Sequence, residues 1–135
     1  MKYLLDTNVL SEVIRKDPNV GVLQRLNEVA PRDLVTSVVC VAELRHGAAR
    51  VAHGARLWKR IRDEILSRVN VLPLGEAEAI RAGDLLATLE ARGEPIGIED
   101  VWIGATALEY GLQVVTRNLK HFRRIPGLTS ESWWT

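Results

Sequence analysis

Short apolar runs alternate with longer segments of helical periodicity along this 135-residue chain. The apolar runs predict four strands, at residues 2–5, 34–36, 69–72 and 112–116. Apolar residues spaced three or four apart predict helices between them, at residues 9–15, 20–29, 39–50, 55–67, 76–91 and 99–110. Short strands that alternate with helices favour a parallel sheet covered by helices on both faces. The predicted fold class is therefore α/β, with three layers.

The composition is that of an ordinary globular protein. Hydrophobic residues make up 47% of the chain and charged residues 26%, and a chain of this length buries enough surface to fold as one domain over residues 1–135. The single cysteine, Cys40, excludes a disulfide framework and a Cys-rich zinc site. No apolar run is long enough to span a bilayer and no signal-peptide pattern opens the chain, so we expect a cytoplasmic protein without a membrane anchor.

Charge is nearly balanced overall but unevenly distributed. The formal net charge is +1, from 18 basic and 17 acidic residues, so the total does not by itself indicate a nucleic-acid partner. Between residues 45 and 68, seven Lys and Arg residues face only two acids, and a second basic cluster occupies residues 117–124. Arg suits phosphate oxygens and surface ion pairs equally, and both interpretations of these clusters stay open at this point.

Three carboxylates lie in unusually apolar stretches of the sequence. Asp6 follows Tyr-Leu-Leu, Glu43 lies within the run VVCVAEL, and Asp100 lies between Ile-Gly-Ile and Val-Trp-Ile. An ionised carboxylate in such surroundings is costly unless it meets a cation or several hydrogen-bond donors. Asp6 also ends the first predicted strand, at the edge where open parallel sheets bind ligands. A divalent cation would satisfy all three carboxylates, and oxygen ligands alone favour Mg²⁺ or Mn²⁺ over Zn²⁺.

Each carboxylate also has a purely structural explanation. Asp6 could cap the helix that follows it. Asp100 could lie at the N-terminus of its own helix, where a negative charge interacts favourably with the helix dipole. Glu43 lies beyond the first turn of its helix, so an ion pair, with Arg45 for example, is its structural alternative. The three histidines show no metal-ligand spacing and are interpreted as surface residues or weak phosphate contacts: His46, His53 and His121.

Four strings, in this order and spacing, resemble the PIN-domain ribonucleases and more narrowly the VapC-type toxins of bacterial toxin–antitoxin pairs. They are LLDTNVLSE at 4–12, VVCVAELRHGA at 38–48, GEPIGIEDVWIGATAL at 93–108 and VVTRNLKHF at 114–122. The resemblance covers residues 2–122, nearly the whole chain. It implies a single PIN domain, an α/β/α arrangement around a short central parallel sheet.

The resemblance also implies roles for particular residues. Asp6, Glu43 and Asp100 match the acidic positions that hold Mg²⁺ or Mn²⁺ in the family and carry its catalysis. Asn8 and Thr116 match polar positions that orient the first carboxylate and the bound water.

Other positions depart from the family pattern or lie outside it. The fourth metal-binding position, often Asp in the family, is Asn118 here, which keeps an oxygen ligand but removes a charge. Glu99 is expected to add negative charge without contacting the metal, because neighbouring helical residues point about 100° apart. RNA-binding residues are expected in the basic clusters: Arg45, Arg117 and Lys120.

The activity that the resemblance implies is metal-dependent hydrolysis of RNA by a toxin. Water activated by Mg²⁺ or Mn²⁺ would cleave a phosphodiester, in single-stranded loops whose unstacked bases can enter a groove. The implied partners are a VapB-type antitoxin in the active-site groove, operator DNA reached only through that antitoxin, and a second copy of the chain in a homodimer. Because Asn118 lacks the family's charge, a catalytically weak module that binds RNA or a partner remains the alternative.

Overall fold

The computed structural model describes all 135 residues and contains a five-stranded sheet in the order β3-β2-β1-β4-β5. Every neighbouring pair is parallel, and the central strand β1 aligns Leu4 with Val35 on one side and with Val114 on the other. The strands are β1 (Tyr3–Leu5), β2 (Leu34–Ser37), β3 (Asn70–Leu72), β4 (Gln113–Val115) and β5 (Ser130–Glu131). The sequence predicts the first four strands, whereas the two-residue edge strand β5 escaped prediction.

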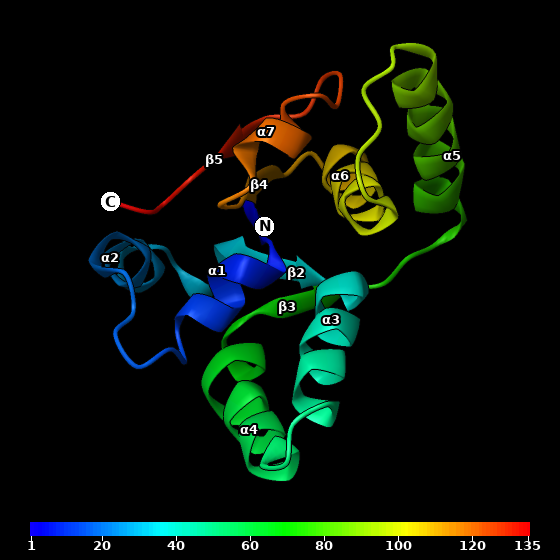
Figure 1. Ribbon diagram of the computed structural model, residues 1–135. Helices are drawn as coiled ribbons and strands as arrows, with labels where there is room; N and C mark the ends of the chain where they lie inside the picture. Colours follow the sequence, from blue (N-terminus) through cyan, green and yellow to red (C-terminus); the bar gives the residue numbers. More distant parts are fainter.

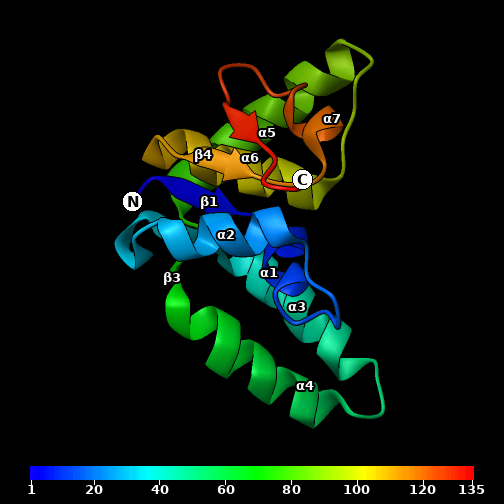
Figure 2. The ribbon, with the colours of Figure 1, turned by 90° about the vertical axis from the view of Figure 1, so that its left-hand side faces the viewer.

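Helices cover both sides of this sheet (Figure 1). They are α1 (Thr7–Glu12), α2 (Val20–Glu28), α3 (Val38–Ala49), α4 (Gly54–Arg60), α5 (Glu76–Ala91), α6 (Ile98–Tyr110) and α7 (Leu119–Phe122). Helices α5 to α7 gather on one side of β1 and β4, and α1 to α4 lie on the other, as Figures 1 and 2 agree. The predicted three-layer α/β fold class is confirmed. None of the helices combines the length and apolar character that crossing a bilayer requires.

The helix predicted at residues 55–67 is divided into three segments. After α4 the chain forms a π-helical turn over Ile61–Ile65 and a 3-10 turn over Leu66–Arg68 before it enters β3. Ile61 and Ile65 are both buried, so the spacing of apolar residues stays that of a continuous helix. The spacing therefore does not predict the change from α-helical to π-helical hydrogen bonding. The first helix lies earlier than the predicted range of residues 9–15. Asp6 caps its N-terminus, so α1 begins at Thr7, and the helix ends at Glu12.

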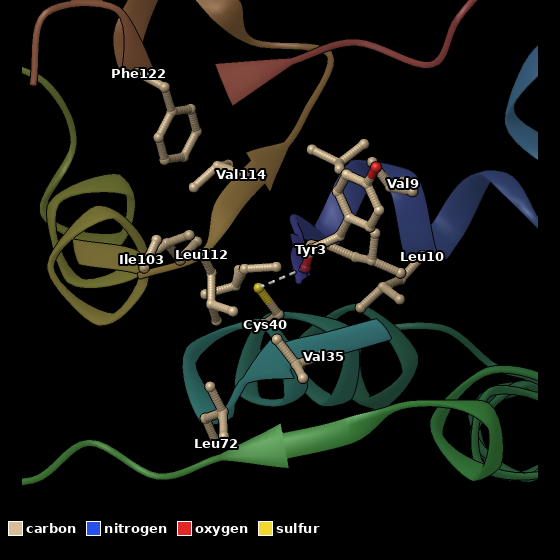
Figure 3. Packing of buried hydrophobic residues seen from close by; sticks show 14 of the residues in the cluster. Tyr3, Val9, Leu10, Val35, Cys40, Leu72, Ile103, Leu112, Val114 and Phe122 are labelled. Atoms are coloured by element: carbon tan, nitrogen blue, oxygen red, sulfur yellow. Dashed lines mark hydrogen bonds between the residues drawn. The ribbon is translucent and has the colours of Figure 1, made fainter. Parts of the chain in front are cut away.

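One hydrophobic cluster joins the layers and fixes the strand ends. It includes the fully buried Leu4 and Leu5 of β1 and Phe122 of the short helix α7, and Figure 3 shows part of this packing. Cys40 lies inside the cluster, with its sulfur 3.8 Å from the backbone oxygen of Leu5. Burial raises the pKa of the Cys40 thiol to about 11, so the group is neutral at pH 7 and serves as a packing residue.

Gly54 marks a close approach between α3 and α4. A Cβ atom added there would overlap the backbone oxygen of Ala48, whereas a Cβ added at Gly83 in α5 would meet no atom within 4 Å. We expect Gly54→Ala to lower the free energy of unfolding by about 1–3 kcal/mol, because backbone has to move. The matched change Gly83→Ala should raise it by up to about 1 kcal/mol, since it only improves helix propensity. Urea denaturation of both variants tests this, and equal effects would contradict it.

Candidate metal centre

Asp6 lies where β1 ends and α1 begins, and it is 4% exposed. One carboxylate oxygen accepts the backbone N–H of Thr7 at 2.8 Å, which caps α1. The other accepts the hydroxyl of Thr116 at 2.8 Å and the side-chain amide of Asn8 at 3.1 Å. Burial raises the pKa of Asp6, the hydrogen bonds from Thr116, Thr7 and Asn8 lower it, and the charge of Asp100 raises it, with a net increase. Helix capping therefore accounts for one carboxylate oxygen of Asp6. The other oxygen belongs to the hydrogen-bond network of the candidate site, through Thr116 and Asn8.

Glu43 reaches the same place from α3. Its carboxylate accepts the hydroxyl of Thr7 at 2.9 Å, and the candidate ligand atoms of Asp6, Cys40 and Glu43 all lie within 4.8 Å of one another. The residue is exposed, but its carboxylate is partly shielded from water. This shielding raises the pKa of Glu43, the bond from Thr7 lowers it, and the charges of Asp6 and Asp100 raise it, so the net shift is upward.

Asp100, in the first turn of α6, forms the second part of the site. Its Oδ2 lies 3.1 Å from Nδ1 of His121 and 3.4 Å from the side-chain nitrogen of Asn118. The backbone N–H of Asn118 donates to the Thr116 hydroxyl at 2.9 Å, and that hydroxyl donates to Asp6. Hydrogen bonds thus connect the two parts. The charge of Asp100 also contributes to the raised pKa values of both Asp6 and Glu43.

The supporting residues inferred from the sequence lie beside these carboxylates. Besides its bond to Asp6, Asn8 accepts the backbone N–H of Arg117 at 3.1 Å, so it connects the loop after β4 to the first turn of α1. Glu99 is exposed, and its charge is the smallest of the recorded contributions to the raised pKa of Glu43. Its effect is therefore electrostatic and weak.

The three predicted RNA-binding residues differ in position. Arg117 stacks over the ring of Trp134, with its guanidinium carbon 5.4 Å from the ring centroid. Lys120 is exposed on α7. Arg45 lies over the ring of Trp58 of α4 at 5.2 Å and forms no ion pair with Glu43. Two residues along a helix correspond to a rotation of about 200°, which explains why Arg45 does not serve as the ion-pair partner of Glu43.

Sequence reasoning missed two polar residues of this site. Thr7 binds both Asp6 and Glu43, and the tripeptide Asp-Thr-Asn carried that information only through family resemblance. His121 contacts Asp100 although it was interpreted as a surface residue. The sequence places His121 one residue before the apolar Phe122. Because the sequence analysis did not predict the helix α7, the direction in which the His121 side chain points could not be inferred.

The donor set suits a hard divalent cation. The carboxylates present oxygen, and the Cys40 thiol, held neutral, is a poor ligand for such an ion. Asp6 and Glu43 both have raised pKa values to which like charges contribute, and a bound dication would offset this repulsion. The residues present therefore fit Mg²⁺ or Mn²⁺ better than Zn²⁺.

Comparison with known proteins identifies the family of this chain. A PIN-domain profile matches residues 3–128. The chain is 37% identical over 133 residues to ribonuclease VapC2 of Haemophilus influenzae and 34% identical over 133 residues to the tRNA(fMet)-specific endonuclease VapC of Salmonella typhimurium, covering 98% of this chain and of each relative. A DNA-bound VapBC structure from Salmonella typhimurium superposes with a TM-score of 0.90 at 34% identity and 98% coverage of both chains. The chain belongs to the PIN-domain family and, within it, to the VapC type.

Desolvation of the Glu43 carboxylate and repulsion from Asp6 and Asp100 should make the metal-free protein more stable when Glu43 is neutral. Because the folded-state pKa of Glu43 is raised, the ionised carboxylate costs stability as pH rises from 4.5 through the folded pKa. We therefore expect Glu43→Gln, which keeps an acceptor for Thr7, to raise the melting temperature at pH 7 without metal and to have less effect at pH 4. Adding Mg²⁺ should stabilise the wild type more than the variant.

Calorimetry with and without EDTA measures both effects. Glu94→Gln, an exposed acid in the loop before α6, is the matched control and should change neither quantity. A variant that is less stable than the wild type at pH 7 without metal would contradict the repulsion argument.

Proposed function

We propose that this chain, as a single PIN domain over residues 1–135, is a metal-dependent endoribonuclease that acts as the toxin of a toxin–antitoxin pair. The observation that carries the proposal is the approach of Asp6 and Glu43, whose candidate ligand atoms lie within 4.8 Å of each other, in a chain of this family. Asp100 lies near enough for its charge to raise the pKa of both. The names of the relatives support it, since one is called a ribonuclease and another a tRNA-specific endonuclease.

Asp6, Glu43 and Asp100 would hold Mg²⁺ or Mn²⁺, with Asn118 as a neutral fourth ligand. When bound, the ion would supply Lewis acidity to the scissile phosphate and lower the pKa of an attacking water. Asn118 would contribute an oxygen without a charge once its carboxamide, whose nitrogen now faces Asp100, is rotated, so the site would carry less negative charge to attract a second ion.

The residues around Asp6 would keep it in place during the reaction. Thr116 and Asn8 bind one oxygen and the Thr7 N–H binds the other, so the carboxylate is restrained from rotating. The Thr7 hydroxyl gives Glu43 a single hydrogen bond, so this carboxylate is held less firmly. Such preorganised ligands avoid a reorganisation cost when charge develops on the substrate.

RNA would approach along the loop that follows β4. Arg117 is tied to Asn8 through its backbone N–H, and its guanidinium stacks on Trp134, so the charge is held near the acidic cluster for a phosphate. Lys120 on α7 would contact the backbone nearby. Arg45, which stacks on Trp58 away from Glu43, would contact only more distant nucleotides. We infer a substrate with unpaired bases, a single-stranded loop, because A-form duplexes hide the bases.

The proposed partners follow the relatives. A solved relative is a VapBC complex bound to DNA. We infer a VapB-type antitoxin that occupies the active-site groove of this chain, contact with operator DNA only through that antitoxin, a homodimer, and a cytoplasmic location. The second candidate function is a catalytically weak RNA- or partner-binding module, and the neutral Asn118 is the observation in its favour.

Loss of one metal ligand should abolish cleavage without unfolding the chain. We expect Asp100→Asn to reduce cleavage of a labelled, loop-containing RNA pool at least about 100-fold, because it removes a charge that holds the ion. EDTA should stop the wild-type reaction, and Mg²⁺ or Mn²⁺ should restore it. The control Asp84→Asn changes an exposed acid of α5 and should leave the rate unchanged.

Full activity of Asp100→Asn, with circular dichroism equal to that of the wild type, would contradict the catalytic assignment. An inactive wild type that still binds RNA would instead support the binding module, and Asn118→Asp would then be the variant that tests whether the missing charge explains the inactivity.

Arg117 should contribute to RNA binding through phosphate contact. We expect Arg117→Ala to raise KM several-fold with a smaller effect on kcat, and to reduce the slope of log affinity against log salt by about 0.7. Arg32→Ala is the control, since Arg32 precedes β2 and lies at the opposite end of the sheet. Filter binding with a catalytically inactive chain measures the slope, and an unchanged slope would remove Arg117 from the RNA interface.

A further inference from the structure

His121 is the one histidine that the fold brings to the acidic cluster. Its side chain is 39% exposed, and Nδ1 points at the carboxylate of Asp100, 3.1 Å away. The same nitrogen lies 2.7 Å from the side-chain nitrogen of Asn118. His121 lies in α7, and the residue after it, Phe122, is completely buried. The backbone that carries the imidazole is therefore anchored in the core.

With the Asn118 carboxamide as placed, the protons of Asp100, Asn118 and His121 do not fit together. If Nδ1 of His121 accepts a hydrogen bond from the Asn118 amide, its lone pair faces the carboxylate of Asp100, and neither atom brings a proton. If Nδ1 carries a hydrogen, it satisfies Asp100 but meets an N–H donor of Asn118 at 2.7 Å. With the amide as placed, either tautomer leaves one close contact unsatisfied.

A cation would satisfy both atoms at their present spacing. Two ligands on neighbouring vertices of an octahedral ion, each about 2.1 Å from it, are separated by about 3 Å. The separation between Nδ1 of His121 and Oδ2 of Asp100 is 3.1 Å. A 180° rotation of the Asn118 carboxamide would exchange its nitrogen for its oxygen. That oxygen would accept an Nδ1 hydrogen when no ion is bound, and it would turn a third lone pair toward a cation at the same point.

The imidazole changes which ion this site prefers. Mg²⁺ is a hard ion that binds oxygen almost exclusively. Mn²⁺ also takes carboxylate and carbonyl oxygen, but as the first member of the Irving–Williams series it accepts an imidazole nitrogen beside them more readily than Mg²⁺ does. A site made of one carboxylate, one amide oxygen and one imidazole therefore differs from a site of carboxylates alone. It carries less negative charge, and it favours a transition ion over Mg²⁺.

We propose that His121, together with Asp100 and Asn118, is a direct ligand for a first-row transition-metal dication, and that it makes this chain prefer Mn²⁺ to Mg²⁺. The proposal rests on the proposed metal-dependent function, which it deepens by naming the ion and one further ligand. His121 acts on metal binding directly and needs no RNA to do so.

Mn²⁺ binding to the purified full chain tests the proposal without any nuclease assay. We expect isothermal titration to show Mn²⁺ binding at least about tenfold tighter than Mg²⁺ in the wild type. His121→Gln, which retains an amide able to hydrogen-bond Asp100, should lose about tenfold in Mn²⁺ affinity and less than about twofold in Mg²⁺ affinity. Pulsed electron paramagnetic resonance should show nitrogen-14 coupling to bound Mn²⁺ in the wild type and not in the variant.

His53→Gln is the matched control, because His53 is exposed at the start of α4 and should affect neither ion. Absence of nitrogen coupling in the wild type, or an equal loss of Mn²⁺ and Mg²⁺ affinity in His121→Gln, would overturn the proposal, since His121 would then only orient Asp100. RNA cleavage by the wild type in the same preparation separates that failure from a failure of the proposed function, which would appear as no metal-dependent cleavage with either ion.

Discussion

Desolvation of carboxylates gathered at one edge of the sheet, together with the repulsion between them, is the constraint on which the rest of this structure depends. Parallel strand order directs the chain after β1 and after β4 to the same edge, and α3 and α6 bring Glu43 and Asp100 there as well. Like charges contribute to the raised pKa values of Asp6 and Glu43. The hydrophobic cluster beneath them stabilises the fold against this cost, and the central strand β1, which is buried along its whole length, belongs to that cluster.

Hydrogen bonds reduce the repulsion only in part, and their distribution is unequal. Asp6 is held by three donors from Thr7, Asn8 and Thr116, whereas Glu43 has the Thr7 hydroxyl alone. The network is therefore rigid around the buried acid and loose at the exposed one. A ligand set of this kind keeps one fixed point for an ion and leaves the others able to adjust as a phosphate enters.

The sequence predicted most of the fold and the three acids, for reasons that also explain what it missed. Long periodic segments such as Glu76–Ala91 carry enough apolar positions to define a helix at its observed bounds. The two-residue strand Ser130–Glu131 and the four-residue helix Leu119–Phe122 are too short to show any period, and the π-helical turn preserves the apolar pattern it interrupts. His121 was missed with α7, because the contact between distant residues depends on that helix and not on local spacing.

The role of Asn118 also depends on contacts with residues that are distant in the sequence. Taken alone, an amide at a position that is often acidic in the family suggests a weaker metal site. In the structure this amide lies between Asp100 and His121 and also donates its backbone N–H to Thr116, which holds Asp6. The substitution therefore lowers the charge at the point where Asp100 already repels Asp6 and Glu43, and it leaves room for a neutral nitrogen ligand beside the remaining carboxylate. A smaller negative charge costs the metal-free fold less, and a ligand of another chemical type can restore affinity for ions that accept nitrogen. Asn118 and His121 contact each other and Asp100, so their contributions to the site have to be considered together.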